Sequence, residues 1–513
     1  MPCPLLPTKI VWGLDFYLNR PKIARFYIYL QTANFKKLNM DSKERIARGL
    51  AVSTDTKIFE MRSGAAECAP QVFKQCFPGR KAAIVADVNT WRVLGKSVDS
   101  LFRAASIPTE SYVIDKNEFH AEWRYVEMTD RIVEGRFDEA RALENSTGYS
   151  DSPAEDSFRP ADENNFVLVS VGSGVINDLC KLASHHHAQS YLTLPTAASV
   201  DGYTSFGASI TYQGAKQTFS CPAPVAVVAD LDVIAAAPKE MTAAGYADLA
   251  AKVPAGAEWM IADFVGSEPI IPDAWHLLQD HLDDLLADPE GVAEGKPEAI
   301  ADLFEGLVLS GFAMQAAQSS RPASCCDHLF SHILDMTEHR FNGKLQSHGF
   351  QVAIGTLTMC AVFDNLFKLD LSDIDVESCV AAWPTLEQEQ NRALEVFKGF
   401  PAPRLGYDQI TLKYEDAEKV RKELTDLKAV WPQLKERLQG QVYSFEKMQR
   451  MFKIVGAPSD PSEIGVTREQ IRDMFPKVQL MRYRFNLLDL AKRGGFYDAI
   501  VDPVFARGGA WEI

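Results

Sequence analysis

An apolar run that ends in a glycine-rich turn, FVLVSVGSGVINDL (residues 166–179), constrains the fold more than any other stretch. The run is typical of a buried strand, and the residues after Gly172 and Gly174 have helical spacing. Earlier in the chain, residues 97–108 also have helical spacing. Similar apolar runs predict further strands at 81–91, 110–115, 190–199 and 224–234. Strands that alternate with helices predict a βαβ sheet.

The hydrophobic pattern of the sequence changes after about residue 240. Strand-like runs stop there, and long helical patterns take over, such as those at 299–317 and 349–367. We therefore predict an α/β, Rossmann-like dinucleotide-binding domain over residues 41–240 and an all-helical domain over residues 241–513. Residues 1–40 are interpreted as an N-terminal extension. Ligands commonly bind between two such domains, so we expect the active site in that cleft.

Charge and cysteine content exclude several classes of protein. The chain has 69 acidic and 53 basic side chains, a net charge of −16, so its field repels nucleic acids and anionic membranes. A small anionic substrate responds only to the electrostatic field near its binding site, so the net charge does not exclude one. We see no apolar run of the roughly 20 residues that a membrane span needs. Nine scattered cysteines without a Cys-x-x-Cys pair fit a reducing, cytoplasmic compartment.

Two features at predicted strand ends are compatible with a nucleotide. Glycines such as Gly172 and Gly174 let the backbone approach a phosphate, and the following helix presents N–H donors. The third glycine of Gly-x-Gly-x-x-Gly is missing, so a tight strand–helix turn without a ligand is an equal alternative. Asp87 follows an earlier strand and has the position of a ribose-binding carboxylate. A turn-forming aspartate explains it equally well.

A second polar segment, SSRPASCCDHLFSH (319–332), contains two histidines and two cysteines. His328 and His332 are four residues apart and share a helix face, as in zinc-binding helices. Cys325 and Cys326 are candidate soft ligands or nucleophiles. The histidine run at 185–187 ends a predicted helix, and we expect these side chains to be exposed. The residues alone leave a metal site, a cysteine site and a polar helix face open.

The order of the motifs resembles a known family. GSGVIND is followed by LPTAASVDGYTSFGASI, then by AGYADLAAK, SSRPASCCDH and SHGFQVAIGT. This order resembles the sn-glycerol-1-phosphate dehydrogenases, nearest to the bacterial AraM-type enzymes. They belong to the superfamily of iron-containing alcohol dehydrogenases, glycerol dehydrogenases and dehydroquinate synthases. The resemblance extends from about residue 50 to about residue 495.

The resemblance implies a metal centre. Its ligands would be Asp248, His328 and His348, and His332 would pack beside the metal without binding it. Two neutral imidazoles and a carboxylate suit Zn, Ni or Fe and leave positions open for substrate oxygens.

The resemblance also implies an activity, the reversible reduction of dihydroxyacetone phosphate to sn-glycerol 1-phosphate with NAD(H) or NADP(H). The partners would be a small phosphorylated triose and further copies of the chain in a homo-oligomer. Another polyol dehydrogenase, an NAD-using cyclase of the same superfamily and an inactive NAD-binding regulator are the alternatives.

Further site residues carry over from the same motifs. Lys252 joins the three metal ligands as a catalytic candidate that could help to neutralise the substrate phosphate, but an ion pair with Asp248 explains it equally well. Arg321 is a candidate for binding the substrate phosphate, or else an anchor at a helix start. Asp201 and Asp248 are the other two residues expected to contact the substrate. The cofactor candidates are Asp87, Thr90, Gly172, Ser173, Gly174, Asp178, Thr196, Ser199 and Ser205.

The chain departs from the family pattern beside the expected metal. Cys325 replaces a glycine, Asp327 replaces a glutamate, and Ala247 replaces a glycine that commonly precedes the metal-binding aspartate. A thiol near the metal would change metal preference or sensitise the site to oxidation. We expect the milder case, in which Cys325 stays protonated and does not bind the metal.

Overall fold

The computed structural model describes residues 40–116, 119–146, 158–213 and 215–513. The predicted extension over residues 1–40 therefore lies almost entirely outside the described residues. Six parallel strands form one sheet in the order β1-β8-β5-β4-β2-β3. The strands are β1 (Ile58–Arg62), β2 (Ala82–Asp87), β3 (Thr109–Ile114), β4 (Val167–Gly172), β5 (Leu192–Pro195) and β8 (Ala226–Asp230). The predicted α/β architecture is confirmed, although the sequence patterns missed β1.

Helices cover both faces of the sheet, which explains the apolar strands. Along β2, Ala83 and Val85 face α7 (Trp123–Val133) and α9 (Gly174–His186), with α8 (Phe137–Glu144) beside α7. The alternating residues Ala82 and Ile84 face α4 (Ala69–Cys76) and α6 (Lys96–Ala104). Successive strand residues point to opposite faces, so a parallel sheet covered on both sides needs continuous apolar runs.

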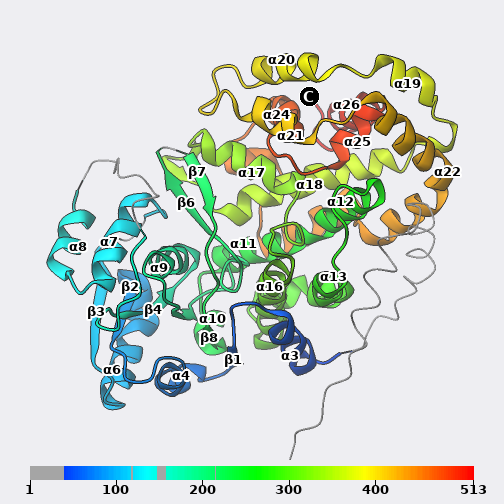
Figure 1. The fold of residues 1–513 in the computed structure, drawn as a ribbon. Helices are drawn as coiled ribbons and strands as arrows, with labels where there is room; N and C mark the ends of the chain where they lie inside the picture. Colours follow the sequence, from blue (N-terminus) through cyan, green and yellow to red (C-terminus); the bar gives the residue numbers. More distant parts are fainter. Residues whose placement is uncertain (1–39, 117–118, 147–157, 214) are drawn as a thin grey trace, which may run out of the picture.

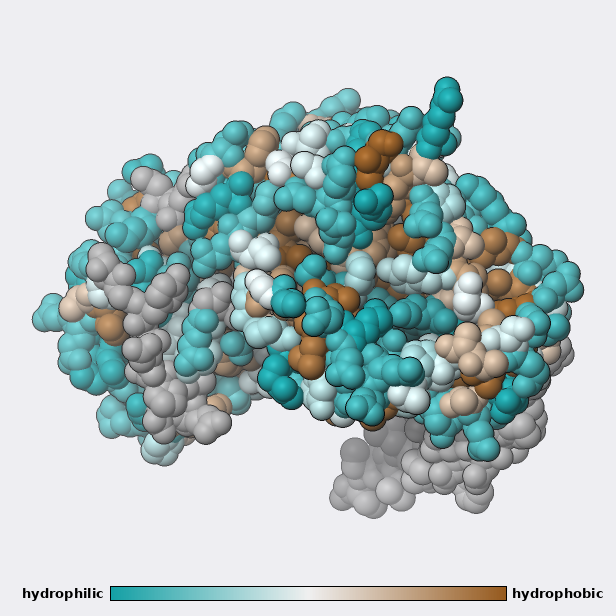
Figure 2. Space-filling view, turned by 90° about the horizontal axis from the view of Figure 1, so that it is seen from above, coloured by the Kyte–Doolittle hydropathy of each residue, from teal (hydrophilic) through white to brown (hydrophobic). Residues whose placement is uncertain are grey.

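A large helical region follows β8 and lies beside the sheet (Figure 1). Its main helices are α11 (Lys239–Ala250), α12 (Lys252–Val265), α13 (Pro272–Leu278), α16 (Pro297–Ala317), α17 (Cys326–Met336), α18 (His348–Leu366), α22 (Ala417–Gln441), α23 (Phe445–Val455), α24 (Arg468–Leu480) and α26 (Tyr497–Phe505). One hydrophobic core runs through these helices. The space-filling view shows a mostly hydrophilic face on which hydrophobic residues are scattered in small groups (Figure 2). The domain limits at residues 40 and 240 stay a prediction.

One described helix, α16, is long and apolar enough to cross a membrane by length and composition, contrary to the expectation that no apolar run reaches this length. It is 21 residues long, and 83% of its most apolar window is buried in the protein. A helix that is apolar on all sides is expected at the centre of a large helical core. The first described helix, α3 (Ser42–Val52), packs on α16, and Arg45 pairs there with Glu305.

Two small antiparallel hairpins are additions to the predicted elements. β6 (Ala208–Tyr212) and β7 (Ala215–Phe219) follow β5 and reach α17. β9 (Arg340–Phe341) and β10 (Lys344–Leu345) join α17 to α18, so the expectation that strands stop after residue 240 was wrong in this detail. These strands of two residues are too short for periodicity to reveal.

The expectation of exposed histidines at the end of α9 was wrong. His186 and His187 are both 2% exposed. The Nδ1 atom of His186 lies 3.1 Å from a carboxylate oxygen of Asp130 on α7, and the Nε2 atom of His187 lies 3.4 Å from the other oxygen. The partner carboxylate lies more than 50 residues away along the chain, so local sequence could not reveal this burial.

Three helices meet at unusually short backbone distances. A Cβ atom on Gly349 of α18 would lie 2.1 Å from the Ala244 carbonyl oxygen of α11. A Cβ atom on Gly355 would lie 2.0 Å from the Asp327 carbonyl oxygen of α17. Because real Cβ atoms do not approach other atoms this closely, α18 packs against both neighbours only with glycine at these positions.

We expect Gly355→Ala to lower the free energy of unfolding, because the added methyl group forces α17 and α18 apart. Overpacking of this kind typically costs about 1–3 kcal/mol. Gly440→Ala in α22 is the matched control, since its Cβ would meet nothing within 4 Å. Replacing an open helical glycine by alanine gains up to about 1 kcal/mol. Denaturant unfolding of both variants checks this, and equal stability of the two would contradict it.

Candidate active site and metal centre

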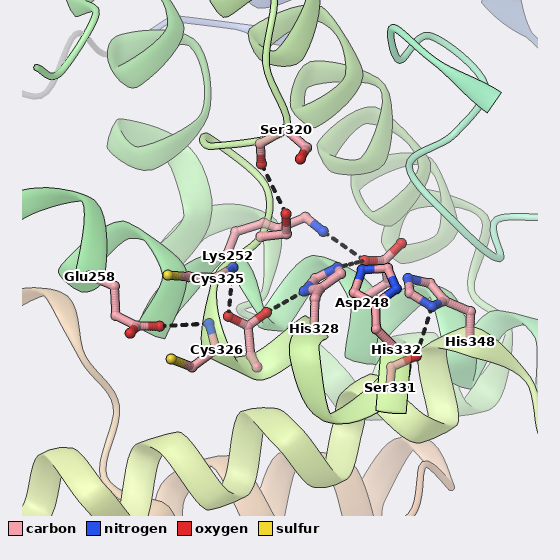
Figure 3. A network of polar contacts seen from close by, with 12 residues as sticks. Asp248, Lys252, Glu258, Ser320, Cys325, Cys326, His328, Ser331, His332 and His348 are labelled. Atoms are coloured by element: carbon pink, nitrogen blue, oxygen red, sulfur yellow. Dashed lines mark hydrogen bonds and ion pairs between the residues drawn. The ribbon is translucent and has the colours of Figure 1, made fainter. Parts of the chain in front are cut away.

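Three side chains from three helices converge beside the sheet. Asp248 lies near the end of α11, His328 in the first turn of α17, and His348 at the start of α18. One potential ligand atom of each lies within 4.8 Å of those of the other two. Figure 3 shows both imidazole rings directed at the Asp248 carboxylate. Asp248 is fully buried, and the rings of His328 and His348 have centroids 5.3 Å apart.

A hydrogen bond fixes which ring nitrogen of His348 is free, and both ring nitrogens of His328 contact carboxylates. Ser331 donates to the Oε1 atom of Gln351 at 2.7 Å, so its oxygen accepts from Nδ1 of His348 at 3.1 Å. His348 therefore carries its proton on Nδ1 and leaves the lone pair on Nε2. In His328, Nδ1 contacts the Asp327 carboxylate, and Nε2 lies 3.5 Å from Asp248. Such contacts orient histidines that bind metals.

The electrostatics of the three side chains favour a cation between them. Burial alone raises the pKa of Asp248, but Lys252 and the two histidines bring it well below its ordinary value. Burial, with the charges of Lys216 and His328, lowers the pKa of His348 to about 3, so this ring is neutral. Burial opposes charge on His328 too, yet Asp327 and Asp248 raise its pKa. A carboxylate and two imidazoles are a donor set that fits a divalent transition metal.

Lys252 is held between two carboxylates. Its ammonium nitrogen lies 2.6 Å from Asp248 and 2.9 Å from Asp201, and the side chain is fully buried. Burial lowers the pKa of Lys252, but the two carboxylates outweigh this and raise it. The Asp201 backbone N–H donates to Asp248 at 3.0 Å, and Ser310 donates to the Asp201 carboxylate. The loop after β5 is thereby tied to α11 and α16.

Arg321 and the two cysteines form a separate group. The guanidinium of Arg321 donates to the Glu258 carbonyl oxygen at 2.8 Å and to the Cys325 sulfur at 3.1 Å. It also lies 3.4 Å from Glu268. Potential ligand atoms of Glu258, Cys325 and Cys326 gather within 4.8 Å of one another, apart from the Asp248 cluster. The structure therefore places Arg321 as an anchor of the segment before α17.

His332 lies next to the three-residue cluster (Figure 3) but has another partner. The Nη2 atom of Arg482 lies 3.1 Å from Nε2 of His332. Because arginine can only donate, Nε2 is the acceptor in this contact. The sequence patterns missed Arg482, Ser331, Gln351 and Ser310. The only available signal was the pair of arginines in MRYRF (481–485), which no spacing rule connects with His332.

The predicted cofactor residues lie along the carboxyl ends of adjacent strands. Asp87 ends β2, Gly172 ends β4, and Thr196 follows β5 with its N–H bonded to the Gly172 carbonyl oxygen at 3.1 Å. Parallel sheets bind nucleotides at this edge. Asp87 accepts from the backbone N–H groups of Asn89 and Thr90, which is the local capping role of a turn-forming aspartate. Ser173 makes no side-chain cap for α9 among the described residues.

The other cofactor candidates have partners within the protein. Asp178 accepts from the Ser209 N–H at 3.1 Å, and burial raises its pKa. Ser199 lies 3.3 Å from the Tyr203 hydroxyl, and Ser205 donates to the Gly202 carbonyl oxygen at 3.2 Å. Gly174 allows close packing, since a Cβ atom there would lie 3.0 Å from Val200.

Comparisons with known proteins agree with this arrangement. A family model described as iron-containing alcohol dehydrogenase matches residues 60–238. Glycerol-1-phosphate dehydrogenase (NAD(P)+) of Bacillus licheniformis is 31% identical over 301 residues, which are 59% of this chain and 69% of that enzyme. The enzyme of the same name from Bacillus subtilis is 28% identical, over 68% of this chain and 84% of that one.

An archaeal relative and a solved structure extend the comparison. Glycerol-1-phosphate dehydrogenase (NAD(P)+) of Pyrococcus horikoshii is 39% identical over 37% of this chain and 54% of its own length. The crystal structure of a probable glycerol dehydrogenase from Sinorhizobium meliloti aligns with a TM-score of 0.51 and 16% identity, over 87% of this chain and 96% of that one.

The parallel sheet and the helical region agree with the family model that matches residues 60–238, which is that of the iron-containing alcohol dehydrogenases, and with the fold of the solved structure. The chain belongs to the glycerol-1-phosphate dehydrogenase family, a family of NAD(P)+-linked enzymes, as its similarity to the Bacillus licheniformis enzyme shows. The family resemblance predicted from the ordered motifs is thus confirmed.

If His328 and His332 are exchanged for alanine in turn, we expect different losses of metal. His328→Ala removes a donor whose Nε2 faces the cluster, whereas the Nε2 atom of His332 is engaged by Arg482. Loss of a contact that merely orients a ligand costs roughly 10–100-fold in metal affinity, so His328→Ala should cost more than that. Metal analysis of both purified variants measures the difference. Retained metal in His328→Ala and lost metal in His332→Ala would reverse the assignment.

Replacing Cys325 by the glycine of the family tests whether the thiol binds metal. Cys325 lies against Arg321 and Glu258, so Cys325→Gly should leave the metal content unchanged. It should also make activity less sensitive to peroxide, because thiols oxidise. Cys68→Ala, which belongs to neither the Asp248 cluster nor the cysteine cluster, is the control and should keep the sensitivity of the unmodified protein. A large loss of metal in Cys325→Gly would make the sulfur a ligand.

Proposed function

We propose that the protein catalyses the reversible, metal-dependent reduction of dihydroxyacetone phosphate to sn-glycerol 1-phosphate with NADH or NADPH. The observation that carries this proposal is the cluster of Asp248, His328 and His348, which brings a carboxylate and two imidazoles together beside the sheet. The relatives of this name provide the substrate and the cofactor class.

The metal would be held by Asp248, His328 and His348. Three protein donors leave coordination positions for a ketone oxygen and a neighbouring hydroxyl oxygen, and the donor set suits Zn, Ni and Fe. Bound metal would supply a Lewis acid that polarises the ketone, and bound NADH or NADPH would supply the hydride. Asp327 and Ser331 hold the two imidazole rings with Nε2 toward Asp248.

Lys252 and Asp201 have a positioning role in this proposal. Lys252 compensates the charge of Asp248 and fixes its carboxylate while the second oxygen accepts from the Asp201 N–H. The substrate would lie next to Asp201, on the loop that joins the sheet to α11. Because Lys252 is fully buried between two carboxylates, we assign it no contact with the substrate phosphate.

The cofactor would lie along the carboxyl edge of the sheet. Gly172, Ser173 and Gly174 would receive the pyrophosphate at the start of α9, where a helix presents N–H donors. Asp87, with Thr90, would face the adenosine ribose from the end of β2. Thr196, Ser199 and Ser205 would lie toward the nicotinamide. Asp178 would support this part of the cofactor site through its contact with Ser209.

Oxidation of NADH by the purified protein with dihydroxyacetone phosphate tests the proposal. Turnover should require added Zn, Ni or Fe after treatment with a chelator, and His348→Ala should abolish it because a ligand is lost. The stereochemistry of the product provides a second measurement. A dehydrogenase specific for sn-glycerol 3-phosphate should not oxidise the product, because the product is sn-glycerol 1-phosphate. Turnover of dihydroxyacetone, but not of dihydroxyacetone phosphate, would instead favour a polyol dehydrogenase.

A further inference from the structure

Several cationic side chains lie in the candidate metal centre or on the elements around it, and most of them already have a carboxylate partner. Lys252 lies between Asp248 and Asp201. The remaining pairs are Lys216 with Asp335 at 2.9 Å and Arg321 with Glu268 at 3.4 Å. A cation paired in this way has little charge left for a substrate. The two candidates that the sequence offered for a substrate phosphate, Lys252 and Arg321, are both among these pairs.

Arg482 is different. Among the described residues, no carboxylate lies within ion-pair distance of its guanidinium, and its one recorded hydrogen bond joins Nη2 to Nε2 of His332. The side chain is partly buried. Burial, with the like charge of Arg484, lowers the pKa of Arg482 to about 10, so the group stays charged at neutral pH. A desolvated charge without a counter-ion is costly, and a bound anion removes this cost.

His332 connects this guanidinium to the helix that carries His328. It lies on α17 one turn after His328, and burial holds its pKa well below the ordinary value, so the ring is neutral. A neutral ring that accepts a hydrogen bond fixes the guanidinium without neutralising it. Arg484, two residues further, donates to the Ser319 and Ser320 hydroxyls at 3.0 Å each and ties the same segment to the loop before α17.

We propose that Arg482 binds the phosphate group of the substrate, with His332 as the residue that positions it. This rests on the proposed function and deepens it, because it gives the site a preference for phosphorylated ketones. In dihydroxyacetone phosphate, one carbon and one oxygen separate the phosphorus from the carbonyl carbon. A cation that receives this phosphate must therefore lie close to the metal ligands, and Arg482 contacts His332, which lies one turn after His328 on α17. The planar guanidinium can donate two parallel hydrogen bonds to phosphate oxygens.

The test compares two substrates that differ only in the phosphate. For Arg482→Gln, kcat/KM for dihydroxyacetone phosphate should fall by about 10- to 100-fold, as expected for a lost charge-assisted hydrogen bond. The loss should lie mainly in KM, and kcat/KM for unphosphorylated dihydroxyacetone should stay within about twofold. Arg482→Lys, which keeps the charge, should retain part of the preference. Arg450→Gln removes an exposed arginine and is the matched control, which should change kcat/KM for neither substrate.

His332 has its own pair of variants. His332→Ala should raise KM for dihydroxyacetone phosphate with less effect on kcat, because the guanidinium loses its acceptor. His332→Gln offers an amide oxygen as acceptor and should restore much of the affinity. Equal loss of kcat for both substrates in Arg482→Gln, or no change in preference, would overturn the proposal.

A binding measurement separates this proposal from the proposed function. Inorganic phosphate is titrated by calorimetry into metal-loaded protein saturated with NAD+, for the unmodified chain and for Arg482→Gln. Binding that Arg482→Gln weakens at least about tenfold supports the phosphate subsite even if the protein does not reduce dihydroxyacetone phosphate. Equal binding to both proteins, or none to either, overturns it even if the protein proves to be the proposed dehydrogenase.

Discussion

The buried carboxylate of Asp248 is the interaction on which the rest of the site depends. One oxygen binds Lys252 and lies near His328, and the other accepts the Asp201 backbone N–H. These contacts join α11 and α17 to the loop after β5. A fully buried carboxylate is stable only when cations and donors surround it, so the charge of Asp248 requires this arrangement, and the same carboxylate is one of the three proposed metal ligands.

Backbone contact between helices makes this convergence possible. Gly349 brings α18 against α11, and Gly355 brings it against α17, so His348 and His328 approach Asp248 from two sides. The hydrogen-bonding partners then determine what each histidine does. Ser331 and Asp327 engage Nδ1 of His348 and His328, whereas Arg482 engages Nε2 of His332. Three imidazoles that lie close together thus have two different kinds of environment.

Much of the α/β region could be predicted because a strand buried on both faces needs a continuous apolar run. Strand β4 and the turn at Gly172 are the clearest example. The edge strand β1 was missed because its residues are only partly buried and form no such run. The buried pair of His186 and His187 was predicted to be exposed, because the Asp130 carboxylate that they face comes from another helix.

The sequence by itself determined the family, through five ordered motifs, and the donor types available for a metal, since these follow from residue identity. Only the tertiary structure decided which charges remain available to a ligand. Lys252 and Arg321 looked equally suited to a phosphate in the sequence, but burial brings each of them a carboxylate partner. Arg482 lies 150 residues from His332 along the chain, and packing alone brings the two into contact. Pairing of charges depends on distances in space, and spacing along a chain sets those distances only within a helix or a strand.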